Sequence, residues 1–182
     1  MKDTDPDAKL VIPQPLNLIG NAWVPARSGR VMEVLSPIDG LPFAQIADSD
    51  AADIDAAIAA ARAAFDGGEW SRLTAAERGR LMIRLSERIL ENIEPLAQLE
   101  RRDNGKPIVQ ARTDMKVTAR YFEFYGGGAD KVHGEIVPFL NGYNVEVHRE
   151  PYGVTGHIIP WNYPAQMFGR SPRRWPWAMQ RS

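Results

Sequence analysis

Residues 154–164 read VTGHIIPWNYP, and this stretch decides the fold class of the chain. Its first part, Val154–Ile159, is an apolar run that predicts a buried strand, since strands of a parallel sheet are covered on both faces. A turn with one proline at each end follows, and Pro164 suits the first turn of a helix. The stretch therefore predicts a strand that leads through a turn into a helix.

The turn from Pro160 to Pro164 is expected to be stiff. Each proline ring fixes one backbone torsion, and the residue before each proline is kept out of helical geometry. Asn162 then projects from a backbone that is set in advance, which suits a hydrogen-bond donor in an oxyanion hole. The residues alone leave an alternative open, in which Asn162 satisfies a turn carbonyl and Trp161 packs in a core.

Short strands and turns are predicted before this stretch, over residues 18–46. Gly20-Asn21 is a hairpin signal within Leu18–Val24. A second turn is predicted over Ser36–Gly40. Much later in the chain, Tyr143–Glu150 alternates in polarity as a half-exposed strand does.

Four helices are predicted between these strands. The first covers Asp50–Phe65, with an apolar stripe. The second opens at the capping box Thr74–Glu77 and ends near Asn92. A third covers Ile93–Arg102, and a fourth runs from Pro107 to about Tyr125, where Gly126–Gly128 is expected to stop it. Strands, then helices, then strands indicate an α/β fold whose main sheet has only begun.

Composition and charge exclude several classes of protein. The 182 residues are 44% hydrophobic and 25% charged, with a net charge of −1 and no cysteine. This balance gives no electrostatic case for nucleic acid or an anionic membrane as partner. Lack of cysteine excludes disulfides, thiolate metal sites and a cysteine nucleophile. We see no signal peptide and no apolar run long enough to span a bilayer, so a cytoplasmic protein is expected.

The stretch 154–164 resembles the motif that opens the cofactor domain of the aldehyde dehydrogenase superfamily. Weaker similarities lie at residues 103–107 and 144–154 and in the opening around Pro37 and Gly40, so the resemblance covers about residues 18–171. It implies the N-terminal part of that α/β fold: helices, a β-hairpin arm and the start of a Rossmann-like cofactor-binding sheet. Residues 1–17 are polar and contain three prolines, so we expect a mobile lead-in there. The resemblance implies that residues 18–171 form a partial cofactor-binding domain.

The resemblance also implies a reaction and its residues. Family members oxidise an aldehyde to a carboxylic acid with NAD or NADP, through a thiohemiacetal and a thioester. Asn162 matches the amide that, with a backbone N–H at the catalytic cysteine, binds the oxygen of the thiohemiacetal. Asp103 matches a carboxylate that contributes to a structural monovalent-cation site in some members, although a plain helix C-terminal turn explains it equally well. The cofactor-binding residues implied are Ile158, Ile159, Pro160, Trp161 and Asn162.

Several parts of the family's machinery are expected to fall outside these residues. The chain has no cysteine, and the lysine, glycine-rich turn and glutamate of the family would follow residue 182. We therefore expect an N-terminal piece that is inactive alone. The alternative function is a non-enzymatic remnant that is degraded or associates with a full-length homologue. Intact relatives are homo-oligomers, and residues 143–150 match their oligomerisation region.

The last residues, 172–182, depart from the helix that the family would continue. Read two bases later, the codons of Trp175-Pro176, Trp177-Ala178 and Met179-Gln180 must give Ala, Gly and Ala, as in a helix-and-turn phrase of the family. We therefore expect a frameshift after about Ser171 and an early stop. The competing interpretation is a tail with Trp and Arg for single-stranded nucleic acid.

Overall fold

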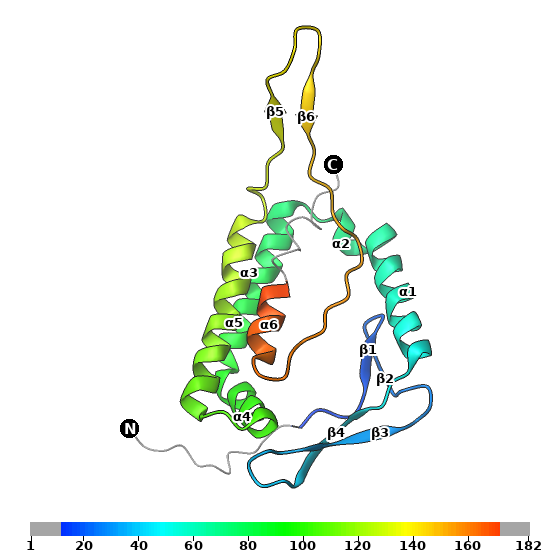
Figure 1. The fold of residues 1–182 in the computed structure, drawn as a ribbon, viewed down its shortest axis with the longest axis vertical. Coiled ribbons are helices and arrows are strands. Elements are labelled where there is room, and N and C mark those ends of the chain that lie inside the picture. The colour runs from blue at the N-terminus through cyan, green and yellow to red at the C-terminus, as the bar shows by residue number, and fades with distance from the viewer. Residues whose placement is uncertain (1–11, 172–182) are drawn as a thin grey trace.

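The computed structural model describes residues 12–171, and it contains helices and short antiparallel strands in one chain (Figure 1). Within this range the strands form three pairs: β1 with β2, β3 with β4, and β5 with β6. The elements in chain order are β1 (Asn17–Ile19), β2 (Ala22–Val24), β3 (Val31–Leu35), β4 (Pro42–Ala47), α1 (Ala51–Gly67), α2 (Glu69–Arg72), α3 (Ala75–Glu91), α4 (Ile93–Asn104), α5 (Ile108–Gly128), β5 (Glu135–Val137), β6 (Val145–Val147) and α6 (Pro164–Arg170).

The two predicted N-terminal turns are confirmed. Gly20 and Asn21 join β1 to β2 with φ of 58° and 63°, the left-handed pair that a two-residue hairpin turn of type I′ requires. The turn around Ser36–Gly40 joins β3 to β4, and the Gly40 amide donates to the Ser36 carbonyl at 2.7 Å. Local turn chemistry is therefore sufficient to predict both hairpins.

The predicted helix starts are confirmed as well. The Thr74 amide donates to the Glu77 carboxylate at 2.8 Å, and the Glu77 amide donates to the Thr74 hydroxyl at 3.3 Å. The same reciprocal pair, made by Asp50 and Asp53, opens α1. Such capping boxes satisfy amides that have no partner within the helix.

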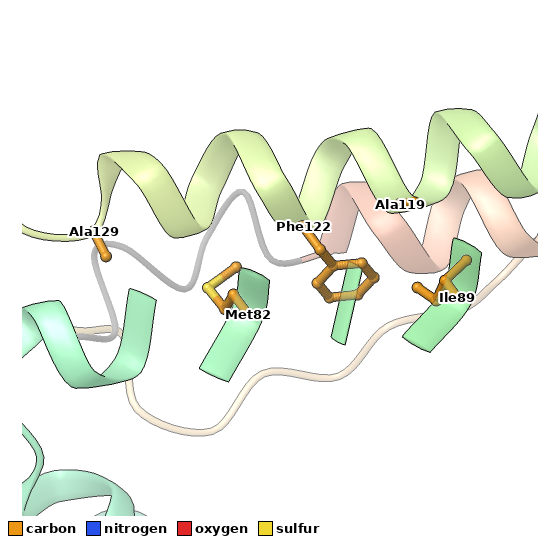
Figure 2. Packing of buried hydrophobic residues seen from close by; sticks show 5 residues of the cluster. All are labelled: Met82, Ile89, Ala119, Phe122 and Ala129. Carbon is orange, nitrogen blue, oxygen red and sulfur yellow. The ribbon is translucent and has the colours of Figure 1, made fainter. Parts of the chain in front are cut away.

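The core lies where α3 and α5 pack against each other (Figure 2). A Cβ added to Gly79 would lie 2.5 Å from the Gly126 carbonyl oxygen, and one added to Gly126 would lie 2.8 Å from the Gly79 oxygen. Only glycine allows so close an approach of two helices. The buried apolar residues of this cluster are Met82, Ile89, Ala119, Phe122 and Ala129.

The close crossing corrects the predicted end of the fourth helix. Gly126–Gly128 was expected to stop the helix near Tyr125, but α5 continues through Gly128. Gly126 is buried against α3, so it serves packing rather than termination. Tertiary contact stabilises the helical geometry that glycine alone disfavours.

The predicted buried strand Val154–Ile159 is wrong. In the described chain this segment is neither helix nor strand, and Ile158 is 99% exposed. A strand requires a hydrogen-bonded neighbour, and each strand among residues 12–171 pairs only with its hairpin partner. The predicted strand Tyr143–Glu150 is shortened to β6 (Val145–Val147), because β5 pairs with three residues only.

The β5–β6 hairpin projects away from the helices, and the chain then returns along an irregular segment to α6, beside α5 (Figure 1). The hairpin exposes apolar side chains: Ile136 is 78% exposed, and Phe139, Leu140 and Tyr143 are exposed as well. The irregular segment leads into the start of α6, and contacts with α5 hold the helix in place.

Candidate functional site

The Pro160–Pro164 turn lies directly before α6, with Tyr163 as the residue that precedes the helix and Pro164 as its first residue. Asn162 is exposed, and its carboxamide makes no hydrogen bond within the described residues. Trp161 is 77% exposed. The alternative in which Asn162 ties up a turn carbonyl and Trp161 packs in a core is therefore not what the structure shows.

Helix α6 is seated closely on α5. Gly169 is buried, and a Cβ there would lie 3.1 Å from the Tyr121 ring and 3.2 Å from Thr118. The Phe168 ring lies 5.5 Å from that of Phe122, centroid to centroid. Gly169 allows close approach to α5, and aromatic rings pack beside Gly169. These contacts fix the position of α6, the helix that follows the turn.

A buried group of charges lies under the start of α6. The Lys106 ammonium pairs with the Glu100 carboxylate and, at 2.7 Å, with the Asp114 carboxylate. The side chains of Lys106, Glu100 and Asp114 are 10%, 4% and 0% exposed. Gln110 and Gln166 each donate to the other Asp114 oxygen, at 2.7 and 2.8 Å. Every member has a partner, as buried charges require.

The two carboxyls of this cluster shift in opposite directions. Burial raises the pKa of Glu100, and this outweighs the opposing hydrogen bond and charge of Lys106. Burial also opposes ionisation of Asp114, but hydrogen bonds from Lys106, Gln110 and Gln166 lower the pKa of Asp114 below its ordinary 3.8. Burial works against the Lys106 charge, yet the two carboxylates raise its pKa. The number of hydrogen bonds that each carboxylate accepts decides whether its pKa is raised or lowered.

The cluster is linked to the turn at Tyr163. The Lys106 ammonium lies 4.7 Å from the centroid of the Tyr163 ring, a cation–π distance. Tyr163 directly follows Asn162 in the chain, and Gln166 lies three residues beyond it in α6. The structure thus brings the predicted turn and a buried ion pair together.

A cleft of about 610 Å³ opens between the β3–β4 hairpin and α4, α5 and the start of α6. Asp103, Pro164 and Ala165 are among its lining residues, and none of residues 158–162, all of which the structure describes, lines it. The predicted cofactor-binding residues therefore lie outside the cleft that Asp103 lines, and all of them except the half-buried Pro160 are exposed.

Asp103, the predicted cation ligand, lies at the end of α4. The residue as a whole is exposed, but partial burial of its carboxyl raises the pKa of Asp103. Among residues 12–171, no three histidine or carboxylate side chains gather to hold a metal ion. A monovalent ion bound chiefly by carbonyl oxygens stays compatible with one carboxylate, so the cation role of Asp103 stays a prediction.

The sequence interpretation missed Glu100, Lys106, Asp114 and Gln166. A signal was present for Asp114: Ala111, Met115, Thr118 and Phe122 recur at helical spacing as one buried face, and Asp114 falls within it. A carboxylate on such a face requires a cationic partner. The partner itself, Lys106, has no periodic signal, because it lies in the connection between α4 and α5.

The fold matches solved structures of one family. Over 92% of this chain and 34% of theirs, it aligns with the NAD⁺ complex of an aldehyde dehydrogenase from Bacillus cereus, with a TM-score of 0.86 and 36% identity. A structure assigned to the same family from Burkholderia cenocepacia is 52% identical, with a TM-score of 0.83, over 89% of this chain and 34% of that one. The model of the aldehyde dehydrogenase family matches residues 23–172. The chain therefore belongs to the aldehyde dehydrogenase family.

Among curated relatives, aldehyde dehydrogenase family 2 member B4, mitochondrial, of Arabidopsis thaliana is 43% identical over 152 residues. The alignment covers 83% of this chain and 28% of the relative. The human retinal dehydrogenase 2 is 41% identical over 82% of this chain and 29% of its own length. The chain thus spans less than a third of the curated relatives that it matches.

Three further predictions concern a membrane span, the N-terminal lead-in and the C-terminal tail. None of the helices described is long and apolar enough to cross a membrane. The predicted lead-in falls partly on residues 1–11, and the predicted frameshifted tail on residues 172–182, both outside the described residues. Asn17, the last residue of the predicted lead-in, begins β1 and exchanges hydrogen bonds with Ser49.

Proposed function

We propose that this chain supplies the oxyanion donor and one wall of the cofactor cleft for NAD(P)-dependent oxidation of an aldehyde to a carboxylic acid. The observation that carries the proposal is the free carboxamide of Asn162 on a turn closed by two prolines. A donor that is exposed, unpaired within residues 12–171 and held by a stiff backbone is ready to receive developing negative charge.

Ile158, Ile159, Pro160 and Trp161 form the proposed wall for the cofactor. The exposure of Ile158 and Trp161 supports this role, because apolar side chains left open to solvent favour contact with a planar ring. The cofactor, when bound, supplies the acceptor for hydride. These residues fit one side of such a group; the contacts that distinguish NAD from NADP are not found among them.

The 182-residue chain alone is proposed to be inactive. It contains no cysteine, and the thioester route of the family needs a thiolate that attacks the carbonyl. The purified chain should therefore form no reduced nicotinamide when NAD⁺ or NADP⁺ and an aldehyde are supplied. Formation of the reduced cofactor at a rate that follows chain concentration would contradict the proposal.

The role of Asn162 is tested in a chimera. Residues 23–171 replace the matching segment of the Bacillus cereus relative, and Asn162→Ala is compared with the parent chimera. Loss of one oxyanion donor should lower kcat about 10²–10³-fold. The matched control is Asn141→Ala, at the exposed tip of the β5–β6 hairpin, which should leave kcat unchanged. Equal kcat for Asn162→Ala and the parent would remove the proposed role.

A second function is supported by a separate observation. The apolar side chains exposed on the β5–β6 hairpin, Ile136, Phe139 and Tyr143 among them, favour association with a full-length homologue without catalysis. Co-expression of the tagged chain with an intact relative should then yield a mixed assembly. Recovery of the tagged chain alone, at concentrations that keep the relative assembled, would exclude this function.

We also infer that residues 172–182 come from a shifted reading frame. The family match ends at residue 172, and the codons of three residue pairs in this segment force Ala, Gly and Ala in the other frame. Sequencing of the coding DNA tests the inference. A second frame that runs without a stop codon through these residues supports it, and a stop codon in that frame contradicts it. The cytoplasmic location stays a prediction, to be checked by fractionation.

A further inference from the structure

The residue that follows Asn162 and the first turn of α6 are both attached to one buried ion pair. Within the turn, the Tyr163 ring lies over the Lys106 ammonium, 4.7 Å from ring centroid to nitrogen. Within α6, Gln166 donates to Asp114 at 2.8 Å. Lys106 and Asp114 pair directly at 2.7 Å. The contacts therefore form a closed path from the turn, through the pair, and back to the helix that follows the turn.

The path is rigid where it is buried. Asp114 is completely buried on α5, and Lys106 is held by two carboxylates, Asp114 and Glu100. A fully paired network in a low-dielectric setting holds its members in one arrangement, because any displacement leaves a charge unpaired. Tyr163 is 42% exposed and Gln166 is half-buried, so the buried pair constrains their positions more than they constrain the pair.

We propose that Lys106 and Asp114 are positioning residues for Asn162. The ammonium holds Tyr163, the residue that follows Asn162, and the carboxylate holds Gln166 in the first turn of α6. The inference rests on the proposed function, in which the Asn162 carboxamide is the oxyanion donor. An oxyanion donor must be in place before charge develops, and the proline rings stiffen the turn without fixing where it lies.

The test measures order at Asn162 in the 182-residue chain itself. Backbone and carboxamide order parameters are obtained by NMR on ¹⁵N-labelled protein, and the carboxamide signal is assigned by its loss in Asn162→Asp. In Gln166→Met, which removes the hydrogen bond to Asp114, the order parameter of Asn162 should fall from about 0.85 to below about 0.6. Lys106 variants are avoided, because they leave buried carboxylates unpaired and threaten the fold.

The matched control is Gln110→Met. Gln110 donates to the same Asp114 oxygen as Gln166, at 2.7 Å, but from α5. The Gln110→Met variant therefore loses the same kind of hydrogen bond to the same carboxylate, but from a residue outside the turn. The order parameter of Asn162 should stay unchanged. Unchanged order in Gln166→Met, or an equal fall in Gln166→Met and Gln110→Met, would overturn the proposal.

A second pair of variants, at Tyr163, tests the contact with Lys106. Tyr163→Phe keeps the ring over Lys106, whereas Tyr163→Leu removes it, and only the leucine variant should lose order at Asn162. Equal order in the two variants would overturn the Lys106 part of the proposal. These measurements need neither aldehyde nor cofactor, so they stand apart from the chimera test: normal kcat in Asn162→Ala removes the oxyanion role and leaves the positioning result intact.

Discussion

At the scale of single residues, the main feature is the ion cluster of Lys106, Glu100 and Asp114. One ammonium serves two carboxylates, and two glutamines supply the remaining donors to Asp114. A buried pair contributes little net stability compared with an apolar core, but removal of one partner is costly, since it leaves an unpaired charge. The cluster therefore favours the one arrangement of α4, α5 and α6 in which every charge is paired.

Replacement of Lys106 by methionine should destabilise the chain by about 3–5 kcal/mol, because Glu100 and Asp114 are left without a cation. The measurement is the free energy of unfolding in urea. Lys116 is the control, as an exposed lysine of α5, the helix that carries Asp114, and Lys116→Met should change stability by less than about 0.5 kcal/mol. Similar free energies of unfolding for Lys106→Met and Lys116→Met would contradict the prediction that the two carboxylates need the Lys106 charge.

Asp114 and Glu100 should affect the pH dependence of stability in opposite ways. The pKa of Asp114 is lowered, so its ionised form stabilises the fold above pH 3.8, and this contribution is lost as the pH falls through the folded-state pKa. The stability gap between the native chain and Asp114→Asn should therefore shrink below pH 3.8. It is measured by urea unfolding across the acidic range.

Glu100 provides the contrast. Its pKa is raised above 4.5, so its contribution is fully present below pH 4.5 and is lost as the pH rises through the folded-state pKa. The gap between the native chain and Glu100→Gln should shrink with rising pH. Gaps that move in the same direction for both variants would contradict the assigned shifts.

At the scale of elements, the α3–α5 crossing decides how the helices pack. Gly79 and Gly126 each face the backbone of the other helix at a distance that excludes a side chain. The neighbouring Gly127 faces open space. The same residue type in one run thus has two different physical roles, and the difference comes entirely from the facing helix.

Alanine at these two neighbours should have opposite effects. Gly126→Ala forces a Cβ against the Gly79 carbonyl and should cost about 1–3 kcal/mol. Gly127→Ala meets nothing and should stabilise α5 by about 0.5–1 kcal/mol, because alanine loses less backbone entropy in a helix. Thermal unfolding followed by circular dichroism gives both values. Destabilisation by Gly127→Ala as large as that by Gly126→Ala would show that the crossing is not the cause.

At the scale of the whole molecule, apolar side chains are exposed on several parts of the described chain. They include the β5–β6 hairpin and the segment before α6, where Ile158 and Trp161 are exposed. Exposed apolar area of this kind marks surfaces that other chains or further protein cover. The solved relatives that match this chain are about three times as long, since it covers 34% of the Bacillus cereus structure.

The isolated chain should therefore bind the dye ANS more strongly than an intact relative does. The expected result is several-fold higher dye fluorescence per mole of protein than for the Bacillus cereus enzyme, together with a cooperative thermal transition from the α3–α5 core. Ile158→Ser combined with Trp161→Ser should reduce dye binding, whereas Ala59→Ser on the exposed face of α1 should not. Dye binding equal to that of the intact enzyme would contradict the exposed surface.

Patterns among neighbouring residues are enough to predict the local elements: the Gly20-Asn21 hairpin turn, the Thr74–Glu77 capping box and the two prolines that bracket Asn162. Each of these depends on residues adjacent in the chain. The stretch 154–164 was also enough to predict the family. The remaining features depend on contacts between segments that are distant in the chain. Val154–Ile159 is apolar enough for a strand, yet no strand forms without a pairing neighbour, and α5 passes through Gly126 because α3 lies against it. The pairing of Lys106 with Asp114 depends likewise on contact between segments, which no local pattern specifies.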